Sequence, residues 1–237
     1  MNRIVTMVLK NLFIVPGAWF KLCHNAKHTD TVPEIDRWRH IQFILNRAIK
    51  GGNVDLKVTG LENIPTEGGC MLYGNHQGLF DVVAISGTCT IPLGAVFKKE
   101  LSEIPLVKQI CQCTRSFAMD REDVRQSLTV IQNVTKEVQN GRKYLIFPEG
   151  TRSRNGNVMG EFHGGSFRCA LKAKCPIVPI ALVDSFKVLD QKGSKPLTVQ
   201  LHYLKPIPYE EFQHMKTNEI AELVKSRIQE VLDREAN

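Results

Sequence analysis

The sequence lacks the motifs through which chains of this length most often bind nucleotides or form covalent intermediates. It contains neither G-x-G-x-x-G nor G-x-x-x-x-G-K-[ST], which argues against a glycine-rich phosphate loop. A G-x-S-x-G elbow, which would present a serine nucleophile, is also absent. The seven cysteines form no disulfide framework, and the C-x-C of Cys111 and Cys113 has no partner pair to complete a zinc site. We therefore expect a reduced, cytosolic compartment and no bound metal.

Long hydrophobic runs are missing as well. Residues 4–14 would reach roughly 17 Å as a helix, against about 30 Å of hydrocarbon in a bilayer. Lys10 and the lack of a small-x-small cleavage site argue against a signal peptide. With 43% hydrophobic and 23% charged residues among 237, the composition is that of a globular chain long enough to bury a substantial core.

Positive charge is concentrated near the N-terminus. Residues 1–50 contain eight Lys or Arg and three Asp or Glu, so they carry +5 of the net charge of +7. Residues 51–237 carry only +2. No base-reading motif accompanies the basic residues, and no aromatic residues are interleaved with them, so a nucleic-acid partner is not expected.

Two basic amphipathic helices are predicted in residues 1–52. The first, within residues 3–20, has a polar stripe at Arg3, Thr6 and Lys10. The second spans residues 34–52, ends at a Gly-Gly pair, and has an apolar face of Trp38, Ile41, Leu45, Ala48 and Ile49. Basic amphipathic helices with an interfacial tryptophan are typical of membrane-surface elements, where anionic head groups add about 1 kcal/mol per nearby Lys or Arg. We expect peripheral or monotopic docking on the cytoplasmic face of the cell membrane. The alternative is that the helices cap the core.

Residues 53–237 predict an α/β domain. Its strand candidates are short apolar segments bounded by Gly, Pro or charge: VDLKVTG, GCMLYGN, LGAVFKK, SFAMD, KYLIFPE, PIVPIALVD and LTVQLHYL. Helical patterns lie between or after them, at residues 122–140, 165–175 and 217–236. This alternation implies a mostly parallel central sheet of about seven strands flanked by helices, with functional residues at the carboxyl ends of strands. The residues that directly follow strand candidates include His76, Asp120 and Glu149.

His76 and Asp81 lie in the segment YGNHQGLFD, where Gly78 permits a tight turn between them. A carboxylate that accepts the Nδ1 proton of histidine fixes the tautomer and leaves Nε2 free as a base. Since no protein nucleophile is recognisable, this base is predicted to deprotonate a substrate alcohol, which then attacks an activated acyl group. Such proton removal contributes roughly 10²- to 10⁴-fold to the rate. A lone histidine near a core is more often structural, but the paired carboxylate favours the dyad.

A second polar segment, FPEGTRSRNG, follows another strand candidate. Glu149 and Arg152 lie on a Gly-containing turn, with Arg154 close behind. The planar fork of a guanidinium can bind two phosphate oxygens, so the segment predicts a phosphate site. The alternative is a surface loop with an internal Glu–Arg pair.

Together these segments resemble the glycerolipid acyltransferases, above all the bacterial 1-acyl-sn-glycerol-3-phosphate acyltransferases. NHQGLFD is similar to the N-H-x(4)-D signature of that family, and FPEGTRS to its E-G-T-R-S block. FKKELSEIP with SFAMDR resembles the second block, and CPIVPIAL the fourth, so four blocks occur in order over residues 53–185. The family is also known for an N-terminal amphipathic helix pair that docks on the bilayer.

The resemblance implies a role for each matching position. His76 would be the general base and Asp81 the residue that orients it. The candidates for binding the acceptor phosphate are Lys98, Arg121 and Arg152. The supporting residues are Asn75, Glu149, Gly150 and Thr151, among which Glu149 would position Arg152 or the acceptor glycerol. The acyl side of the cleft would be shaped by Val178, Pro179 and Ile180.

Structural alternatives and departures from the family pattern accompany these assignments. Lys98 is alternatively a solvated lysine, and Arg121 alternatively pairs with Asp120 or Glu122. Gly78 stands where many members have a serine. The segment EFHGGSF lacks the lysine of F-K-x-G, so that His163 either replaces this lysine or only packs.

The reaction implied by the resemblance is acyl transfer at the membrane surface. A fatty acyl group would pass from acyl-CoA or acyl-carrier protein to the sn-2 hydroxyl of 1-acyl-sn-glycerol-3-phosphate (lysophosphatidate), forming phosphatidic acid. No bound cofactor and no covalent acyl-enzyme would be needed. A different acceptor, such as glycerol-3-phosphate or another lysophospholipid, is one alternative. A non-catalytic membrane-lipid-binding protein is the other, and its signature would be a broken dyad.

Overall fold

The computed structural model describes residues 2–235. Its helices are α1 (Arg3–Leu9), α2 (Val15–Lys27), α3 (Glu34–Gly51), α4 (Phe80–Thr88), α5 (Val107–Thr114), α6 (Val124–Gln139), α7 (Arg168–Ala173), α8 (Phe186–Leu189), α9 (Tyr209–Phe212) and α10 (Thr217–Glu235). Its strands are β1 (Val54–Thr59), β2 (Cys70–Gly74), β3 (Leu93–Lys98), β4 (Phe117–Met119), β5 (Lys143–Ile146), β6 (Ile177–Val183) and β7 (Leu197–Tyr203). Short 3-10 helices occupy Leu61–Asn63, Lys99–Leu101 and Gly164–Phe167.

The strand candidates form one seven-stranded sheet with the order β1-β7-β6-β2-β5-β3-β4. Strands β6 and β7 pair antiparallel, and the other neighbours pair in parallel. The predicted mostly parallel sheet of about seven strands is therefore confirmed. Its middle strand is β2, which lies between β6 and β5 and ends at Gly74, where the loop that carries His76 begins.

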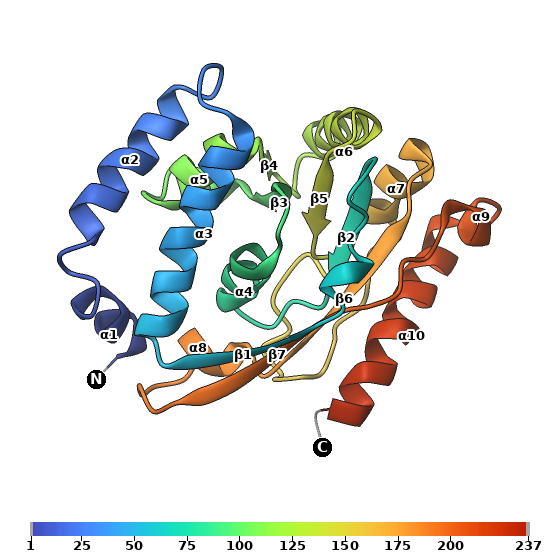
Figure 1. Cartoon of the computed structure of the whole chain (residues 1–237). Coiled ribbons are helices and arrows are strands. Elements are labelled where there is room, and N and C mark those ends of the chain that lie inside the picture. Colours follow the sequence, from blue (N-terminus) through green and yellow to red (C-terminus); the bar gives the residue numbers. More distant parts are fainter. Residues whose placement is uncertain (1, 236–237) are drawn as a thin grey trace.

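Helices cover both faces of the sheet, as Figure 1 shows. Along β2 the side chains alternate between the two faces. Cys70 and Leu72 enter a core shared with α3 and α4, whereas Met71 and Tyr73 enter a core shared with α6, α7 and α10. Because both faces are covered, the polar loops can meet substrate only at the ends of the strands.

The N-terminal region forms three helices instead of the predicted two. Pro16 lies in the first turn of α2, where its fixed φ favours a helix start. The Asn11 amide donates to the carbonyl oxygens of Met7 and Arg47 at 2.7 and 3.1 Å, and so holds the turn between α1 and α2. In Figure 1 the three helices lie together at one end of the molecule.

Helix α3 packs on the protein core. Trp38 is 2% exposed, and its indole N–H donates to the carbonyl oxygen of Cys89 at 3.0 Å. Ile41 is completely buried, and Leu45 nearly so. The interfacial position predicted for Trp38 is therefore wrong, because α4 covers the apolar face that was expected to meet lipid. The division of the chain at residue 52 stays a prediction.

Helix α1 turns Arg3 and Thr6 of its polar stripe inward and most of its apolar residues outward, while Lys10 stays exposed. Arg3 is 5% exposed and donates to the carbonyl oxygens of Gly52 and Lys195 at 2.5 and 3.0 Å. Six apolar side chains of α1 and the following turn are 45 to 98% exposed, namely Ile4, Val5, Val8, Leu9, Leu12 and Phe13. A contiguous exposed apolar patch of this kind marks an interaction surface. Between residues 2 and 235, no helix combines the length and apolar character needed to cross a bilayer.

Candidate active site

The structure assembles the His–Asp dyad predicted from the sequence. His76 lies in the loop after β2, and Asp81 lies in the first turn of α4. His76 Nδ1 is 2.7 Å from Asp81 Oδ2, and because an ionised carboxylate can only accept, Nδ1 carries the proton. His76 Nε2 has no hydrogen-bond partner among residues 2–235, and the side chain is 19% exposed. The free nitrogen can therefore serve as a base toward an incoming substrate.

The carboxylate of Asp81 is fully buried and held by four donors. Besides His76 Nδ1, Oδ2 accepts the backbone N–H groups of Gln77 and Gly78 at 2.6 and 2.9 Å. Oδ1 accepts the hydroxyl of Ser185. A buried carboxylate needs such donors, since each lost hydrogen bond leaves it desolvated. Ser185 was missed in the sequence, because it lies 104 residues away and arrives only through the pairing of β6 with β2.

Asn75 and Gln77 tie the dyad loop to the end of β6. Asn75 donates to the carbonyl oxygen of Leu182 at 2.9 Å and accepts its N–H at 2.8 Å, which continues the pairing of β2 with β6 beyond Gly74. The Gln77 side chain donates to the same Leu182 oxygen at 2.8 Å and accepts from Ser185 N at 3.0 Å. Both side chains are buried. They fix the backbone on either side of His76, which gives the predicted supporting residue Asn75 a positioning role.

Glu149 supports the dyad loop and does not contact Arg152. Its Oε1 accepts the backbone N–H of His76 at 2.6 Å, and its Oε2 accepts that of Gly160 at 2.8 Å. The alternative of an internal Glu149–Arg152 pair is therefore wrong, because Glu149 is buried with backbone donors on both oxygens. A contact of Glu149 with the acceptor glycerol stays a prediction. Gly150 takes a left-handed φ of +69° to turn the chain, and Thr151 is exposed.

We expect Glu149→Gln to destabilise the fold by about 1–3 kcal/mol, because one of the two backbone donors loses its acceptor. The loss should depend on pH, since burial raises the pKa of Glu149 above its ordinary 4.5 and two backbone N–H groups only partly oppose this. The folded chain then holds this proton more tightly than the unfolded chain does. The stabilising contribution of Glu149 is complete below pH 4.5 and is lost as the pH rises through the raised pKa.

Denaturant unfolding of the wild type and Glu149→Gln at a series of pH values measures this effect. The free-energy difference between them should be largest at acid pH and shrink as the pH rises above 4.5. A difference that stayed constant or grew with pH would contradict the assignment of a raised pKa.

The imidazole ring of His76 also packs against Phe147. The two ring centroids are 4.2 Å apart and the planes differ by 16°. The backbone N–H of Ser153 donates to the His76 carbonyl oxygen at 2.9 Å. The segment around Glu149 therefore contacts both the ring and the backbone of His76. Phe147 precedes Glu149 by two residues, and only the parallel pairing of β5 with β2 brings it to the ring.

The three predicted phosphate-binding cations differ in their surroundings. Lys98 forms an exposed ion pair with Glu100 at 2.6 Å, and Arg152 pairs with Asp190 at 2.9 Å. Arg121 has no ion pair or hydrogen bond with any residue in the described part of the chain. Its expected alternative partner, Asp120, pairs with Lys99 instead. Arg121 is therefore the candidate whose guanidinium is available for a ligand.

Arg121 and His163 converge on Gly150. A Cβ built on Gly150 would lie 3.8 Å from Arg121 Cζ and 3.6 Å from His163 Nε2. Both side chains are exposed at this point, one residue after Glu149. His163, which stands in the segment that lacks the lysine of F-K-x-G, therefore lies beside the free guanidinium of Arg121 and is not packed in the core.

A cavity of about 310 Å³ lies next to the dyad loop, because Gln77, the residue after His76, is part of its lining. The other lining residues are Arg152, Arg154, Phe186 and Asp190. Helix α8 approaches the dyad loop closely at Gly78. A Cβ on Gly78 would lie only 2.8 Å from Asp190 Oδ2 and 3.2 Å from Phe186 Cα. The close approach of α8 leaves little room for a side chain at position 78, since a Cβ there would require the Asp190 carboxylate to turn aside and the Phe186 backbone to shift slightly.

The residues predicted to shape the acyl side of the cleft lie within the sheet. Val178, Pro179 and Ile180 belong to β6, align with Leu72, Tyr73 and Gly74 of β2, and are all buried. None of them lines the cavity beside the dyad. The structure thus shows them as support for the strand that carries the dyad, and contact with an acyl chain stays a prediction.

Within residues 2–235, no activated thiol lies near the dyad. Burial raises the pKa of six thiols to about 11 or about 12, and these belong to Cys70, Cys89, Cys111, Cys113, Cys169 and Cys175. Thiols with such pKa values are poor nucleophiles at neutral pH. Within residues 2–235, no three His, Cys, Asp or Glu side chains are grouped so that they could hold a metal ion.

A His–Asp dyad with a free Nε2 at the carboxyl edge of a mostly parallel sheet is the arrangement expected of an enzyme that activates a hydroxyl group. The family model described as Acyltransferase matches residues 55–183, which is more than half of the chain. The chain therefore belongs to the acyltransferase family.

Curated relatives carry the name 1-acyl-sn-glycerol-3-phosphate acyltransferase. The protein from Borreliella burgdorferi is 29% identical over 169 residues, which cover 68% of this chain and 67% of the relative. The protein from Pseudomonas aeruginosa is 33% identical over 148 residues, covering 62% of this chain and 56% of the relative. The matched regions thus span between about half and two thirds of these relatives.

The fold matches a crystal structure of the 1-acyl-sn-glycerophosphate acyltransferase PlsC from Thermotoga maritima. The TM-score is 0.77, and the match covers 98% of this chain and 97% of the other at 20% sequence identity. At this identity the likeness concerns the fold.

Proposed function

We propose that the protein transfers a fatty acyl group from acyl-CoA or acyl-carrier protein to the sn-2 hydroxyl of 1-acyl-sn-glycerol-3-phosphate, forming phosphatidic acid. The observation that carries the proposal is the His76–Asp81 dyad, whose Nε2 is unpaired and partly exposed. Membership of the acyltransferase family and the names of the curated relatives support the acyl reaction and this acceptor.

In the proposed reaction, His76 Nε2 takes the proton of the sn-2 hydroxyl as its oxygen attacks the thioester carbonyl. The new C–O bond forms, the C–S bond breaks, and the departing thiolate receives the proton from the imidazolium. Asp81 stabilises the positive charge that the ring carries between these steps. The intact geometry of the dyad and the lack of an activated thiol support direct transfer over a covalent acyl-enzyme.

The acceptor phosphate is proposed to bind beside Gly150. Arg121 brings an unpaired guanidinium to this point, and the imidazole of His163 lies beside the same glycine. Charge-assisted hydrogen bonds from a guanidinium to phosphate are strong and fix orientation, which brings the hydroxyl to His76. Arg152 and Lys98 already have carboxylate partners, so they are secondary candidates that would have to exchange them.

We expect Arg121→Ala to raise the KM for lysophosphatidate about 10- to 100-fold, because a hydrogen bond to a charged group is lost. The KM for the acyl donor and the rate with a monoacylglycerol acceptor, which has no phosphate, should not change. Arg125→Ala removes an exposed arginine from the first turn of α6 and is the matched control. Steady-state kinetics with each substrate varied in turn make the comparison. An equal effect on both acceptors would contradict phosphate binding by Arg121.

The protein is proposed to act at the cytoplasmic face of the cell membrane, docked through the outer side of α1. Helix α1 packs against α8, and Phe186 of α8 lines the cavity beside the dyad. Leu79 and Val82, which follow His76, are 53 and 38% exposed. Apolar side chains beside the active site favour substrates drawn from the bilayer.

Incubation of the full chain with labelled lysophosphatidate and acyl-CoA or acyl-carrier protein, followed by product identification, tests the proposed function. We expect phosphatidic acid and an equal amount of free thiol. Product formation from glycerol-3-phosphate or another lysophospholipid alone would identify a different acceptor. Thiol release without acceptor would indicate a thioesterase, and vesicle binding without thiol release would indicate a non-catalytic lipid-binding protein.

A further inference from the structure

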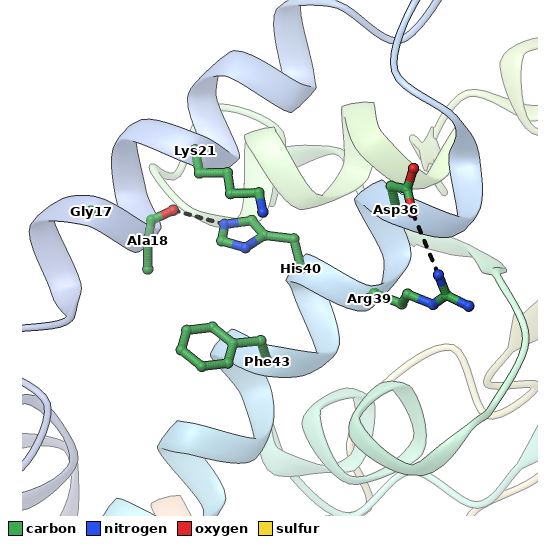
Figure 2. Close-up of a pocket in the computed structure, with 7 residues that line it drawn as sticks. All are labelled: Gly17, Ala18, Lys21, Asp36, Arg39, His40 and Phe43. Carbon is green, nitrogen blue, oxygen red and sulfur yellow. Dashed lines mark hydrogen bonds and ion pairs between the residues drawn. The ribbon is translucent and has the colours of Figure 1, made fainter.

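A groove of about 700 Å³ lies between α2 and α3, and it shares no lining residue with the cavity beside His76. Figure 2 shows its lining, which is Gly17, Ala18, Lys21, Asp36, Arg39, His40 and Phe43. The residues from α3 follow a spacing of three and four, so they lie along one face of that helix, from which His40 and Phe43 point toward α2 in Figure 2. Acyl transfer at the dyad does not account for this face.

The polar part of the groove is cationic. Lys21 forms no ion pair with any residue between 2 and 235. Arg39 has only a 3.6 Å pair with Asp36, in which both side chains are more than half exposed. An exposed ion pair contributes little, so the guanidinium remains available to a second anion. Two cations therefore share the groove with one weakly paired carboxylate.

His40 holds the two helices together at the base of the groove. It is 7% exposed, and its Nε2 donates to the carbonyl oxygen of Ala18 at 3.0 Å, as drawn in Figure 2. Burial first, and then the nearby Lys21 ammonium, lower the pKa of His40. At neutral pH the ring is therefore uncharged, and the positive charge of the groove comes from Lys21 and Arg39.

Exposed aromatic side chains flank these cations. Phe43 lines the groove and is 47% exposed, while Phe20, one turn beyond Gly17 on α2, is 73% exposed. Phe13, four residues before Gly17, is 98% exposed and belongs to the apolar outer side of α1 and the following turn. Cations set beside exposed aromatic rings match an amphiphile with an anionic head better than a fully hydrated anion.

We propose that this groove binds the head group of an anionic phospholipid, while the surrounding apolar side chains enter the same membrane leaflet. The lipid phosphate would lie between Lys21 and Arg39. Gly17 leaves room for it, since no atom lies within 4 Å of the position of a Cβ there. The inference rests on the proposed membrane docking and adds a defined site to it, because attraction through diffuse charge would need no groove.

Partition of the full chain onto vesicles at constant ionic strength tests the site. The vesicles are phosphatidylcholine alone and phosphatidylcholine containing phosphatidylglycerol, and the readout is the ratio of the two partition coefficients. Gly17→Leu fills the groove without changing charge, and Lys21→Gln removes one cation. We expect each to lower the anionic-to-neutral ratio about fivefold and to leave binding to neutral vesicles unchanged or, for Gly17→Leu, slightly stronger.

Lys27→Gln is the matched control, because Lys27 is an exposed lysine of the same helix outside the groove. Its ratio should stay closer to that of the wild type than to that of Lys21→Gln. The proposal would be overturned if Gly17→Leu kept the anionic-to-neutral ratio of the wild type, or if Lys27→Gln lowered that ratio as much as Lys21→Gln does. Either result would show that the attraction comes from diffuse charge. A wild type that binds both vesicles equally would also overturn it. If the wild type bound neither kind of vesicle, the proposed membrane docking would be wrong as well. Acyl transfer to detergent-dispersed substrate is measured in parallel and tests the proposed function separately.

Discussion

His76→Ala should lower kcat for acyl transfer by about 10²- to 10⁴-fold, because it removes the proposed general base for the acceptor hydroxyl. The KM values should change little, since the proposed phosphate contacts lie at Gly150 and not at the imidazole. The fold should survive, because Asp81 keeps three of its four donors. Stopped assays of product formation and thermal unfolding of the same preparation measure both effects.

His214→Ala provides the matched control for this experiment. His214 is exposed in the turn between α9 and α10, so its removal should change neither turnover nor stability. Added imidazole should restore part of the activity of His76→Ala, because a diffusible base can occupy the space of the lost ring. Full turnover by His76→Ala would show that the dyad does not supply the base, whatever the state of the fold.

Asp81→Asn should lower kcat about 10²-fold or more with little loss of stability, because it removes charge and keeps most hydrogen bonds. The amide oxygen can still accept from His76 Nδ1 and from the N–H groups of Gln77 and Gly78. The amide nitrogen would face Ser185, whose hydroxyl can turn to accept it and donate to Gln77 Oε1 at 3.1 Å. The imidazolium that forms during catalysis would then lack its counter-charge.

Asp81→Ala separates the electrostatic effect from the structural one. It leaves buried donors without an acceptor, each at a cost of about 1–3 kcal/mol, so this variant should unfold at lower denaturant concentration than Asp81→Asn. Kinetics and denaturant unfolding of the two variants are compared side by side. Wild-type turnover by Asp81→Asn would refute a role for the negative charge, and equal instability of the two variants would show that the network depends on the ionised form.

Helix α6 and the central strands could be predicted from local patterns. Asp123 caps α6 by accepting from the N–H groups of Arg125 and Gln126, and the helix ends just before an Asn-Gly pair, as the periodicity indicated. The seven apolar segments became the seven strands because each is short, apolar and bounded by turn residues. The dyad was also predictable, since His76 and Asp81 are close in sequence and are joined by one tight turn.

Contacts between distant segments were not predictable in the same way. Ser185 reaches Asp81, and Glu149 reaches the backbone of His76, only because β6 and β5 flank β2 in the sheet. Glu149 and Arg152 are close in sequence and suggested a Glu–Arg pair, but Arg152 pairs with Asp190, just after α8, instead. Such partners depend on strand order, and strand order is decided by the packing of the whole core.

By itself, the sequence determined the seven strands and three helical regions of the α/β body and the close approach of one histidine to one aspartate, because these depend on neighbours along the chain. It could not say which medium each amphipathic face would meet. Trp38 and Arg3 show this, since one apolar face turned toward the core while one polar stripe turned inward and left apolar residues outside. A hydrophobic pattern records that a helix has two unlike faces, and only the tertiary packing decides which of them is covered by protein.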